Sequence, residues 1–434
     1  MPLPLLSGLS KVAATIPPPS GNTDDTPVEV TNLKALGSYN WIEDEVPTIA
    51  IPGRPATWKD QPIPIRLRED LGAPFFDENL ARNISFPLEP DLLAIEVSQA
   101  ADPEFDLSKE NIDIVTNRNN LRKLVNFANS GGKNGGSYTD KFRIDAQLAL
   151  NGRTMILTRY EKPRYKPQAP VQQQNDDPPQ GNRPEQNNGQ SQYKPFIGFD
   201  HIFERMCTEE LPTIHAAGSS GSNVSLRPVG YHRIVRYDLL GLRFLVRSRV
   251  DSMLQGSAHP QLESTSETEI DSLSNALEKA RLEPDSEPSE VSTPLLQGEE
   301  SGVRYVKFGE HVSQDLLMDI KLAPNGRVNW KNAYPQYFLS QTPKLRVATR
   351  ATVRGQDFVA QLKTYDPDSL KIEHDLQSQR FRNLAFVLKQ MRQILQAHGS
   401  SQPLAFVWTQ RGGMKVYKIE EKSKYLSDKG LSKF

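Results

Sequence analysis

Hydrophobic residues alternate with polar ones in many short stretches of the chain, which is the pattern of half-buried β-strands. Three pairs of such stretches flank a short turn, at 142–160, 232–250 and 404–419, and each pair predicts a β-hairpin. The same alternation predicts further strands, at 47–53, 316–322, 345–353 and 358–364. Strands therefore dominate the predicted secondary structure.

Helical periodicity is found in three segments, at 120–128, 196–207 and 378–397. The longest of them, 378–397, has one apolar face. This face consists of Leu384, Val387, Leu388, Met391, Ile394 and Leu395. Together with the strands, these helices predict an α+β fold, in which a mixed and mostly antiparallel sheet is flanked by helices.

Two long stretches interrupt the pattern. Residues 163–194 consist largely of Gln, Asn, Pro and Gly, and residues 254–300 are rich in Ser, Glu and Pro. Both compositions are typical of disordered segments. We therefore expect a disordered N-terminal tail at 1–35, one domain over 36–420 with disordered insertions at these two places, and a C-terminal tail at 421–434.

The overall charge balance hides a strong asymmetry. The net charge is −1, from 52 Lys and Arg and 53 Asp and Glu. Residues 254–300 carry 11 acidic residues against two basic ones, whereas residues 301–434 carry 22 basic residues against 11 acidic ones. A basic C-terminal region suits a partner with a phosphate backbone, although an ordinary solvated surface explains this charge equally well.

Cysteine content and hydropathy bear on the compartment. The one cysteine, Cys207, can form neither an internal disulfide nor a thiolate metal cage. No stretch reaches the roughly 18 consecutive apolar residues of a membrane span. The N-terminus has the pattern of neither a secretory signal nor a mitochondrial presequence. We therefore expect an intracellular protein of the nucleus or cytoplasm with no membrane partner.

The chemically informative residues lie on two predicted strands. Asp251 ends one strand, and Asp319 and Lys321 lie two positions apart on another, so their side chains project from the same face. Carboxylates from neighbouring strands can share Mg²⁺ or Mn²⁺, which activates a water for attack on phosphorus. A nearby lysine can orient that water. The pattern is that of a restriction-endonuclease-like nuclease core, and a solvent-facing strand pair is the alternative.

Taken in order along the chain, several segments resemble the DXO-type family of decapping nucleases, which act on RNA 5′ ends. These segments are 113–124, 196–207, 248–251, 319–321, 337–341, 350–364 and 404–419. They cover most of residues 36–420. The resemblance is closest to a fungal branch that is often labelled geranylgeranyl pyrophosphate synthetase, but the chain lacks the two Asp-rich DDxxD helices which that activity needs.

The resemblance implies a metal site and catalytic residues. Glu204, which follows a phenylalanine on the helix predicted at 196–207, would bind the metal together with Asp251 and Asp319. Asp319 and Lys321 would both act in catalysis, with Lys321 positioning the attacking water. The cofactor would be Mg²⁺ or Mn²⁺.

The resemblance also implies substrate contacts and contains one departure. Arg118 would hold substrate phosphates, and Gln341 falls near a glutamine of the family's active site. Arg249 stands where the family has its first strand carboxylate, so the local charge differs by two units. Close to a metal ion this exchange is unfavourable unless the side chain turns away, and it argues against two-metal chemistry. We assign Arg249, like Arg118, to substrate binding.

The sequence thus predicts a divalent-metal-dependent hydrolase that acts on RNA 5′ ends. The resemblance implies removal of incomplete or NAD-type caps, 5′-triphosphate hydrolysis and 5′→3′ trimming as its reactions, and a 5′→3′ exoribonuclease as a partner. The alternative is a catalytically weakened member that binds RNA or a protein through the same groove, because Arg249 replaces a metal-site acid. A prenyl-diphosphate enzyme is a third hypothesis without a supporting motif.

Overall fold

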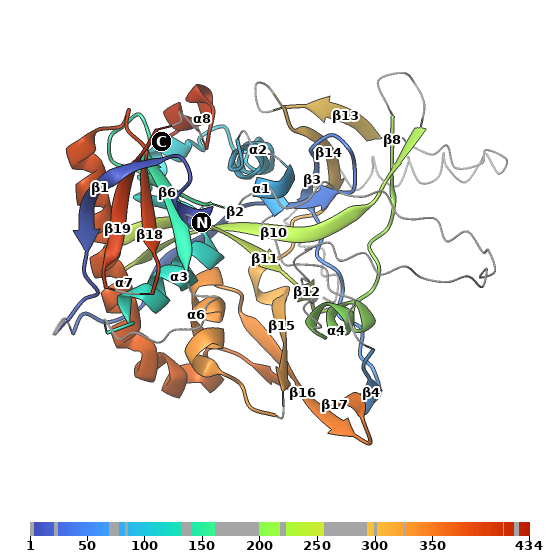
Figure 1. Ribbon diagram of the computed structural model, residues 1–434. Helices are drawn as coiled ribbons and strands as arrows, with labels where there is room; N and C mark the ends of the chain where they lie inside the picture. Colours follow the sequence, from blue (N-terminus) through green and yellow to red (C-terminus); the bar gives the residue numbers. More distant parts are fainter. Residues whose placement is uncertain are drawn as a thin grey trace, which may run out of the picture.

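The computed structural model describes the chain in twelve segments. They are residues 4–20, 25–68, 78–82, 86–131, 141–160, 199–217, 223–255, 293–298, 302–324, 326–410, 412–420 and 425–434. Two β-sheets form the centre of the molecule, and helices cover both faces of the larger sheet (Figure 1). The insertion predicted at 163–194 lies outside the described residues.

The larger sheet has 14 strands, in the order β1-β19-β18-β6-β7-β5-β11-β10-β2-β3-β14-β13-β8-β9. The bounds of these strands are β1 Leu9–Ile16, β2 Val30–Ile42, β3 Thr48–Gly53, β5 Ile114–Asn117, β6 Phe142–Leu148, β7 Met155–Arg159, β8 Ile214–Ala217, β9 Asn223–Leu226, β10 Pro228–Leu239, β11 Leu242–Val250, β13 Thr293–Gln297, β14 Arg304–Gly309, β18 Leu404–Trp408 and β19 Met414–Ile419.

The smaller sheet has five strands, in the order β12-β15-β16-β17-β4. Their bounds are β12 Ser252–Met253, β15 Leu317–Pro324, β16 Lys344–Val353, β17 Gln356–Tyr365 and β4 Ile65–Arg66. The helices are α1 Glu78–Arg82, α2 Glu89–Ser98, α3 Arg118–Ala128, α4 Asp200–Met206, α6 Trp330–Ser340, α7 Lys371–His398 and α8 Asp428–Ser432, with short 3₁₀ turns η1 Pro4–Leu6, η2 Leu107–Glu110, η4 Gln314–Leu316 and η5 Asp368–Leu370.

Strand pairing is mixed and mostly antiparallel, as the sequence predicts. The three predicted hairpins are β6–β7, β10–β11 and β18–β19, and all three pair in antiparallel register. Five pairs are parallel, among them β11 with β5 and β15 with β16. The α+β class is therefore confirmed.

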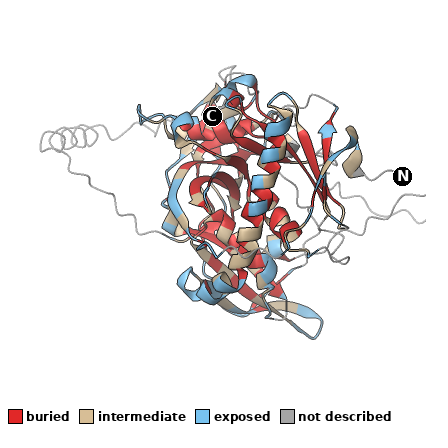
Figure 2. Ribbon diagram, turned by 90° about the vertical axis from the view of Figure 1, so that its left-hand side faces the viewer, coloured by how far each residue is buried: buried red, intermediate tan, exposed pale blue. Residues whose placement is uncertain are grey.

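Two buried cores lie on opposite faces of the larger sheet. The first packs α3, α6 and α7 against one face, and its largest apolar side chains include Phe127, Phe244 and Phe381. The second packs α2 against the other face, around Trp41 and Ile234. Figure 2 views the molecule from the α7 side, and buried residues (red) fill the interior behind that helix. Alternate residues of the central strands thus face different cores, as the pleat of a strand requires.

The predicted disordered tail at 1–35 is wrong. β1 pairs antiparallel with β19, with Ile16 opposite Met414, and both side chains are buried in the first core. β2 also begins inside the predicted tail, at Val30. The stretch before β2 is rich in Pro, Ser and Thr, so its composition hides a strand whose partner lies about 400 residues away in the sequence.

Two further boundary predictions are wrong. The predicted C-terminal tail contains α8, and its Leu426 and Leu431 are buried in the second core. The predicted disordered insertion at 254–300 contains β13, which pairs with β14 and β8. Residues 256–292 of that insertion lie outside the described residues.

The helices agree with the sequence where an apolar face is clear. α3 and α7 are confirmed, although α7 begins seven residues before the predicted start, and α4 occupies the second half of the segment predicted at 196–207. α2 and α6 were not predicted. α6 contains Pro335, and α2 is buried on several sides, so neither has a simple apolar face.

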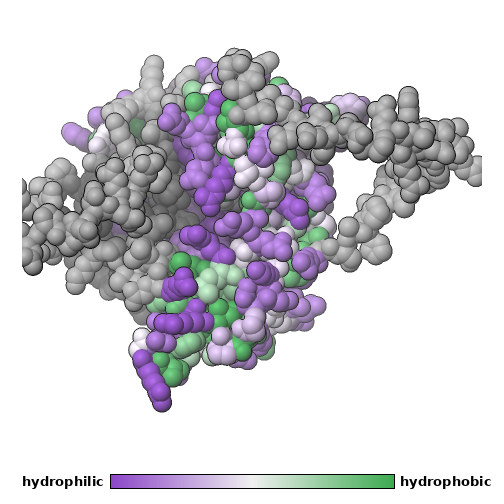
Figure 3. Space-filling model, turned by 90° about the vertical axis from the view of Figure 1, so that its right-hand side faces the viewer, coloured by the Kyte–Doolittle hydropathy of each residue, from purple (hydrophilic) through white to green (hydrophobic). Residues whose placement is uncertain are grey.

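The surface on the side of β8, β13 and β4 is largely hydrophilic, with hydrophobic residues gathered in its lower part (Figure 3). Among the residues that the structure describes, no helix is both long enough and apolar enough to cross a membrane.

Candidate functional site

Asp251 lies where the chain passes from one sheet to the other. It follows β11 of the larger sheet and precedes β12, which pairs with β15 of the smaller sheet through Ser252 and Met318. Asp251 Oδ2 accepts a hydrogen bond from the backbone N–H of Ile320, at 2.9 Å. The fold therefore brings Asp251 beside the strand that carries Asp319, which is the juxtaposition that the motif predicts.

Arg118 and Asp319 form one ion pair at this junction. Arg118 is the first residue of α3, whose N-terminus is capped by Asn117: its side-chain oxygen accepts the N–H of Asn120. Arg118 Nη1 lies 2.6 Å from Asp319 Oδ2. The side chain of Asp319 is only 8% exposed and that of Arg118 is 20% exposed, so water reaches the arginine more easily than the carboxylate.

Arg249 and Glu204 form a second ion pair, which links β11 to α4. Burial opposes the charge of Arg249, but Glu204 and the nearby carboxylates Asp251, Glu78 and Asp319 outweigh it and raise the pKa of the guanidinium above its already high value. Arg249 therefore lies among four acidic residues. Arg249 thus points into the predicted metal site rather than away from it.

The carboxylates of this cluster are electrostatically strained. Burial raises the pKa of Asp251 to about 7, and repulsion from Glu204 and Asp319 adds to the effect, against the opposing influence of Arg249. Burial also raises the pKa of Asp319, although Arg118 and Arg249 act to lower it. Two arginines thus compensate only part of the negative charge.

Lys321 lies on the same face of β15 as Asp319. The residues between and beside them, Met318, Ile320 and Leu322, pack on the opposite face, into a cluster beneath α4. Among the described residues the side-chain ammonium of Lys321 has no hydrogen-bond or ion-pair partner, and Lys321 is half-buried. Its ammonium group is therefore available to a ligand at this edge of the sheet.

The hydrogen bonds of Gln341 are with Phe338 and Gln314, not with Glu204, Asp251 or Asp319. It ends α6 in the left-handed conformation, with φ 55°, and its Nε2 donates to the carbonyl of Phe338 at 2.5 Å. The side chain thus closes the end of its own helix. Its predicted catalytic role stays a prediction. Cys207 is fully buried, and burial raises the pKa of its thiol to about 11, as expected for a core residue rather than a nucleophile.

A buried polar network behind Arg249 was missed by the sequence reasoning. His232 faces Arg249 across the β10–β11 pair, and its ring lies 2.7 Å from the carboxylate of Glu78 on α1. Burial opposes the charge of Glu78, but the bond to His232 and the charges of Arg249 and Arg82 lower its pKa to about 2. Burial lowers the pKa of His232, so we take the imidazole as neutral and as a hydrogen-bond donor to Glu78.

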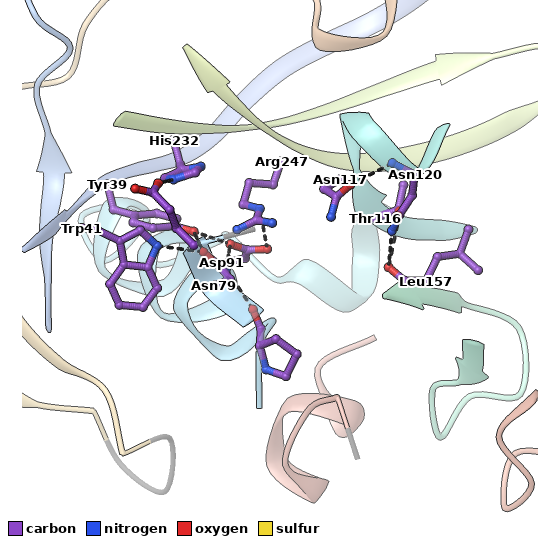
Figure 4. Close-up of polar contacts among 12 residues, drawn as sticks. Tyr39, Trp41, Asn79, Asp91, Thr116, Asn117, Asn120, Leu157, His232 and Arg247 are labelled. Atoms are coloured by element: carbon purple, nitrogen blue, oxygen red, sulfur yellow. Dashed lines mark hydrogen bonds and ion pairs between the residues drawn. The ribbon is translucent and has the colours of Figure 1, made fainter. Parts of the chain in front are cut away.

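The network continues from α1 to α2 (Figure 4). Asn79 accepts hydrogen bonds from Tyr39 Oη at 2.7 Å and Trp41 Nε1 at 2.9 Å, and its amide donates to Asp91 at 3.0 Å. Asp91 in turn lies 3.8 Å from Arg247. The only sequence signal for this network is the alternation of charged residues at 247, 249 and 251, at the end of β11 and just after it.

The carboxylates have the chemistry of a divalent-metal site but are not arranged as one here. Among the residues that the structure describes, no group of three or more His, Cys, Asp or Glu is placed to hold a metal ion. Glu204 and Asp319 each face a guanidinium. One buried oxygen, Asp319 Oδ1, has no hydrogen-bond partner. The oxygen donors of this cluster therefore suit a hard cation. The two ion pairs occupy Glu204 and Asp319, and they would have to open before a cation could bind there.

Comparisons with known proteins bear on the fold. Residues 12–174 match a family model described as a domain of unknown function, DUF8563. None of the curated proteins matches the chain in sequence. In contrast, the crystal structure of S. pombe Rai1 matches over 91% of this chain and 97% of that chain, with a TM-score of 0.50 and 11% sequence identity.

The chain has the Rai1 fold. Rai1 is a decapping enzyme of the DXO family, so the resemblance stated from the motifs is confirmed at the level of fold. Two other Rai1 structures are similar at lower scores. Candida albicans Rai1 in complex with pU5-Mn²⁺ has a TM-score of 0.48 and 10% identity, with 96% of this chain and 95% of that chain covered. Scheffersomyces stipitis Rai1 in complex with (3′-NADP)⁺ and calcium ion has a TM-score of 0.47 and 11% identity, with 92% of this chain and 94% of that chain covered.

Proposed function

We propose that the protein binds phosphorylated 5′ ends of RNA at this site and hydrolyses them there. The observation that carries the proposal is the meeting of Glu204, Asp251 and Asp319 with two guanidinium groups where the two sheets of a Rai1 fold join. Guanidinium groups are preferred partners of phosphate, and carboxylates are preferred ligands of hard divalent cations. Fold likeness alone would be an analogy, so the proposal depends on these residues.

Arg118 and Lys321 are, with Arg249, the positive charges that a 5′-phosphate can reach. Arg118 starts α3, so a phosphate at this place also meets the positive end of the helix dipole. Lys321 lies on the same strand face as Asp319, as in the restriction-endonuclease-like core that the motif implies, and its ammonium can donate to a phosphate oxygen or to a water. We propose for each residue the role that the sequence predicts: phosphate binding for Arg118 and positioning of the attacking water for Lys321.

A divalent cation, when bound, would supply Lewis acidity and lower the pKa of an attacking water. The oxygen atoms of Glu204, Asp251 and Asp319 would hold it, and the buried Oδ1 of Asp319 has no hydrogen-bond partner that would have to be removed. The backbone N–H of Ile320 holds Asp251 in place through its hydrogen bond to Oδ2. The other carboxylate oxygen of Asp251 is left for a ligand.

The test compares short RNAs that differ only at the 5′ end: triphosphate, monophosphate, NAD cap and hydroxyl. Purified protein with Mn²⁺ is expected to release 5′-terminal products from at least one phosphorylated RNA and none from the hydroxyl RNA. Asp319→Ala and Lys321→Met should each lower the rate by about 100-fold or more, because each removes a charge that contacts the reacting group. Lys331→Met, on the exposed start of α6, is the matched control and should leave the rate unchanged.

A second candidate function is binding of RNA 5′ ends without turnover. The ion pair between Arg249 and Glu204 favours it, because this pair occupies a carboxylate that a metal would need. In that case the wild type binds the 5′-phosphorylated RNA, releases no product, and is unaffected by Asp319→Ala. Equal binding of RNAs with and without a 5′-phosphate would refute both functions.

A further inference from the structure

The two ion pairs of the site occupy the groups that a cation and a phosphate would need. Arg118 holds Asp319 and Arg249 holds Glu204, so each carboxylate that a cation would need already has a guanidinium. Conversely, each guanidinium that a phosphate would need already has a carboxylate. Neither ligand alone can bind without leaving one charge of a pair uncompensated in a largely buried place.

We propose that the ion pairs Arg118–Asp319 and Arg249–Glu204, which we call the latch, make a divalent cation and a 5′-phosphate bind cooperatively. The inference rests on the proposed function and deepens it, because it states how the same site is regulated. A phosphate that pairs with Arg118 and Arg249 releases Asp319 and Glu204. A cation that takes those two carboxylates releases the guanidinium groups. Each ligand thus prepares the site for the other.

The burial of the four side chains supports this exchange. The two arginines are the more exposed members, at 20% and 28%, whereas Asp319 and Glu204 are 8% and 17% exposed. An anion can therefore approach the guanidinium groups from the solvent side, while the carboxylates stay behind them. Asp319 Oδ1, which is buried and has no partner, marks the position that positive charge would fill once the pairs open.

Thermodynamic linkage makes the coupling reciprocal: the factor by which phosphate tightens metal binding equals the factor by which metal tightens phosphate binding. Coupling of this kind is about 5- to 150-fold in proteins, and two opened ion pairs place the expectation at about 10- to 100-fold. Without the latch, the two ligands would bind almost independently.

The experiment measures Mn²⁺ binding, not activity. Free Mn²⁺ is followed by electron paramagnetic resonance during titration of the full chain, with a 5′-phosphorylated hexaadenylate, with the same RNA bearing a 5′-hydroxyl, or with no RNA. Gel electrophoresis of the recovered RNA verifies that no turnover occurs during the titration. We expect the phosphorylated RNA to tighten Mn²⁺ binding about 10- to 100-fold, and the hydroxyl RNA to change it less than about threefold.

Variants of the latch test the residues. Arg249→Gln frees Glu204, so it should bind Mn²⁺ at least about tenfold more tightly without RNA and lose most of the coupling. Arg118→Gln frees Asp319 and should act in the same direction, which keeps the test valid if one variant does not fold. The control is Arg243→Gln, on the same strand β11 as Arg249 but with an exposed side chain, and it should behave as the wild type.

The outcomes separate this inference from the proposed function. Wild-type Mn²⁺ binding that is equally tight with phosphorylated and hydroxyl RNA overturns the latch. The proposed function still stands in that case if fluorescence anisotropy shows preferential binding of the phosphorylated RNA. Failure of that RNA to bind overturns both. Coupling that persists unchanged in Arg249→Gln and Arg118→Gln also overturns the latch, because another route would then carry it.

Discussion

Replacing Asp251 by asparagine is expected to stabilise the protein at neutral and basic pH. Burial and the repulsion of Glu204 and Asp319 raise the pKa of Asp251 to about 7 in the folded protein. The ordinary value for aspartate, which applies to the unfolded chain, is about 3.9. Between these pH values the folded state holds a proton that the unfolded state has released. The stability of the wild type therefore falls as pH rises from about 4 to 7, and this loss is complete above pH 7.

The size of the effect follows from the pKa difference. About three pKa units, at about 1.4 kcal/mol each, give about 4 kcal/mol as an upper bound. Because the neighbouring carboxylates titrate together, we expect about 2–4 kcal/mol. Asparagine keeps an oxygen that can accept the N–H of Ile320, so the hydrogen bond to β15 survives the substitution. Asp251→Asn should thus equal the wild type near pH 4 and exceed it by this amount near pH 8.

Urea denaturation over a series from pH 4 to pH 8.5, with EDTA to remove divalent cations, measures this difference. The matched control is Asp375→Asn, which replaces an exposed carboxylate on α7 and should not reproduce the gain in stability near pH 8. A variant that is less stable than the wild type at pH 8 would refute the reasoning, because it would show that the ionised Asp251 stabilises the folded protein. A pH-independent difference would refute it equally.

Three further predictions concern the fold. Asn79→Ala should destabilise the protein by about 2–5 kcal/mol in urea denaturation, because the buried N–H of Trp41 loses its acceptor, whereas Asn119→Ala on α3 should have little effect. The thiol of Cys207 should not react with Ellman's reagent at pH 8 in the native state and should react fully in denaturant, since burial raises its pKa to about 11; rapid native reaction would contradict its place in the core. Deletion of residues 1–20 should lower the melting temperature by several degrees, because it removes β1 from its pairing with β19. An unchanged melting temperature would instead support the predicted disordered tail at 1–35.

Local pattern was enough for elements whose partners are close in the sequence. The three hairpins join neighbouring segments, so alternation and a turn define both the strands and their pairing. β1 fails this condition because its partner is β19, at the other end of the chain. α6 fails for another reason: Pro335 interrupts the helical signal, and packing against α3 and α7 stabilises the helix despite it.

The acidic and basic residues of the candidate site were predicted from the sequence, but their ion pairs were not. The spacing of Asp319 and Lys321 on one strand, after a strand ending in Asp251, is readable from sequence because alternation along a strand fixes the face. Nothing in the sequence pairs Arg118 with Asp319, which lies 201 residues further along the chain. The same holds for Glu78 and His232, which meet only because α1 packs beside β10.

The position of Arg249 explains how the fold tolerates a positive charge in a place built for acids. Glu204 pairs with it from α4, and the charge of Glu78, which His232 on the neighbouring strand holds, also favours it. A guanidinium between two carboxylates offsets the cost of burial that a lone charge would carry. Arg249 therefore stabilises the folded site and supplies positive charge that a divalent cation would otherwise provide. Any ligand that draws Arg249 away must bring its own negative charge, and under the proposed function a phosphorylated RNA end would supply it.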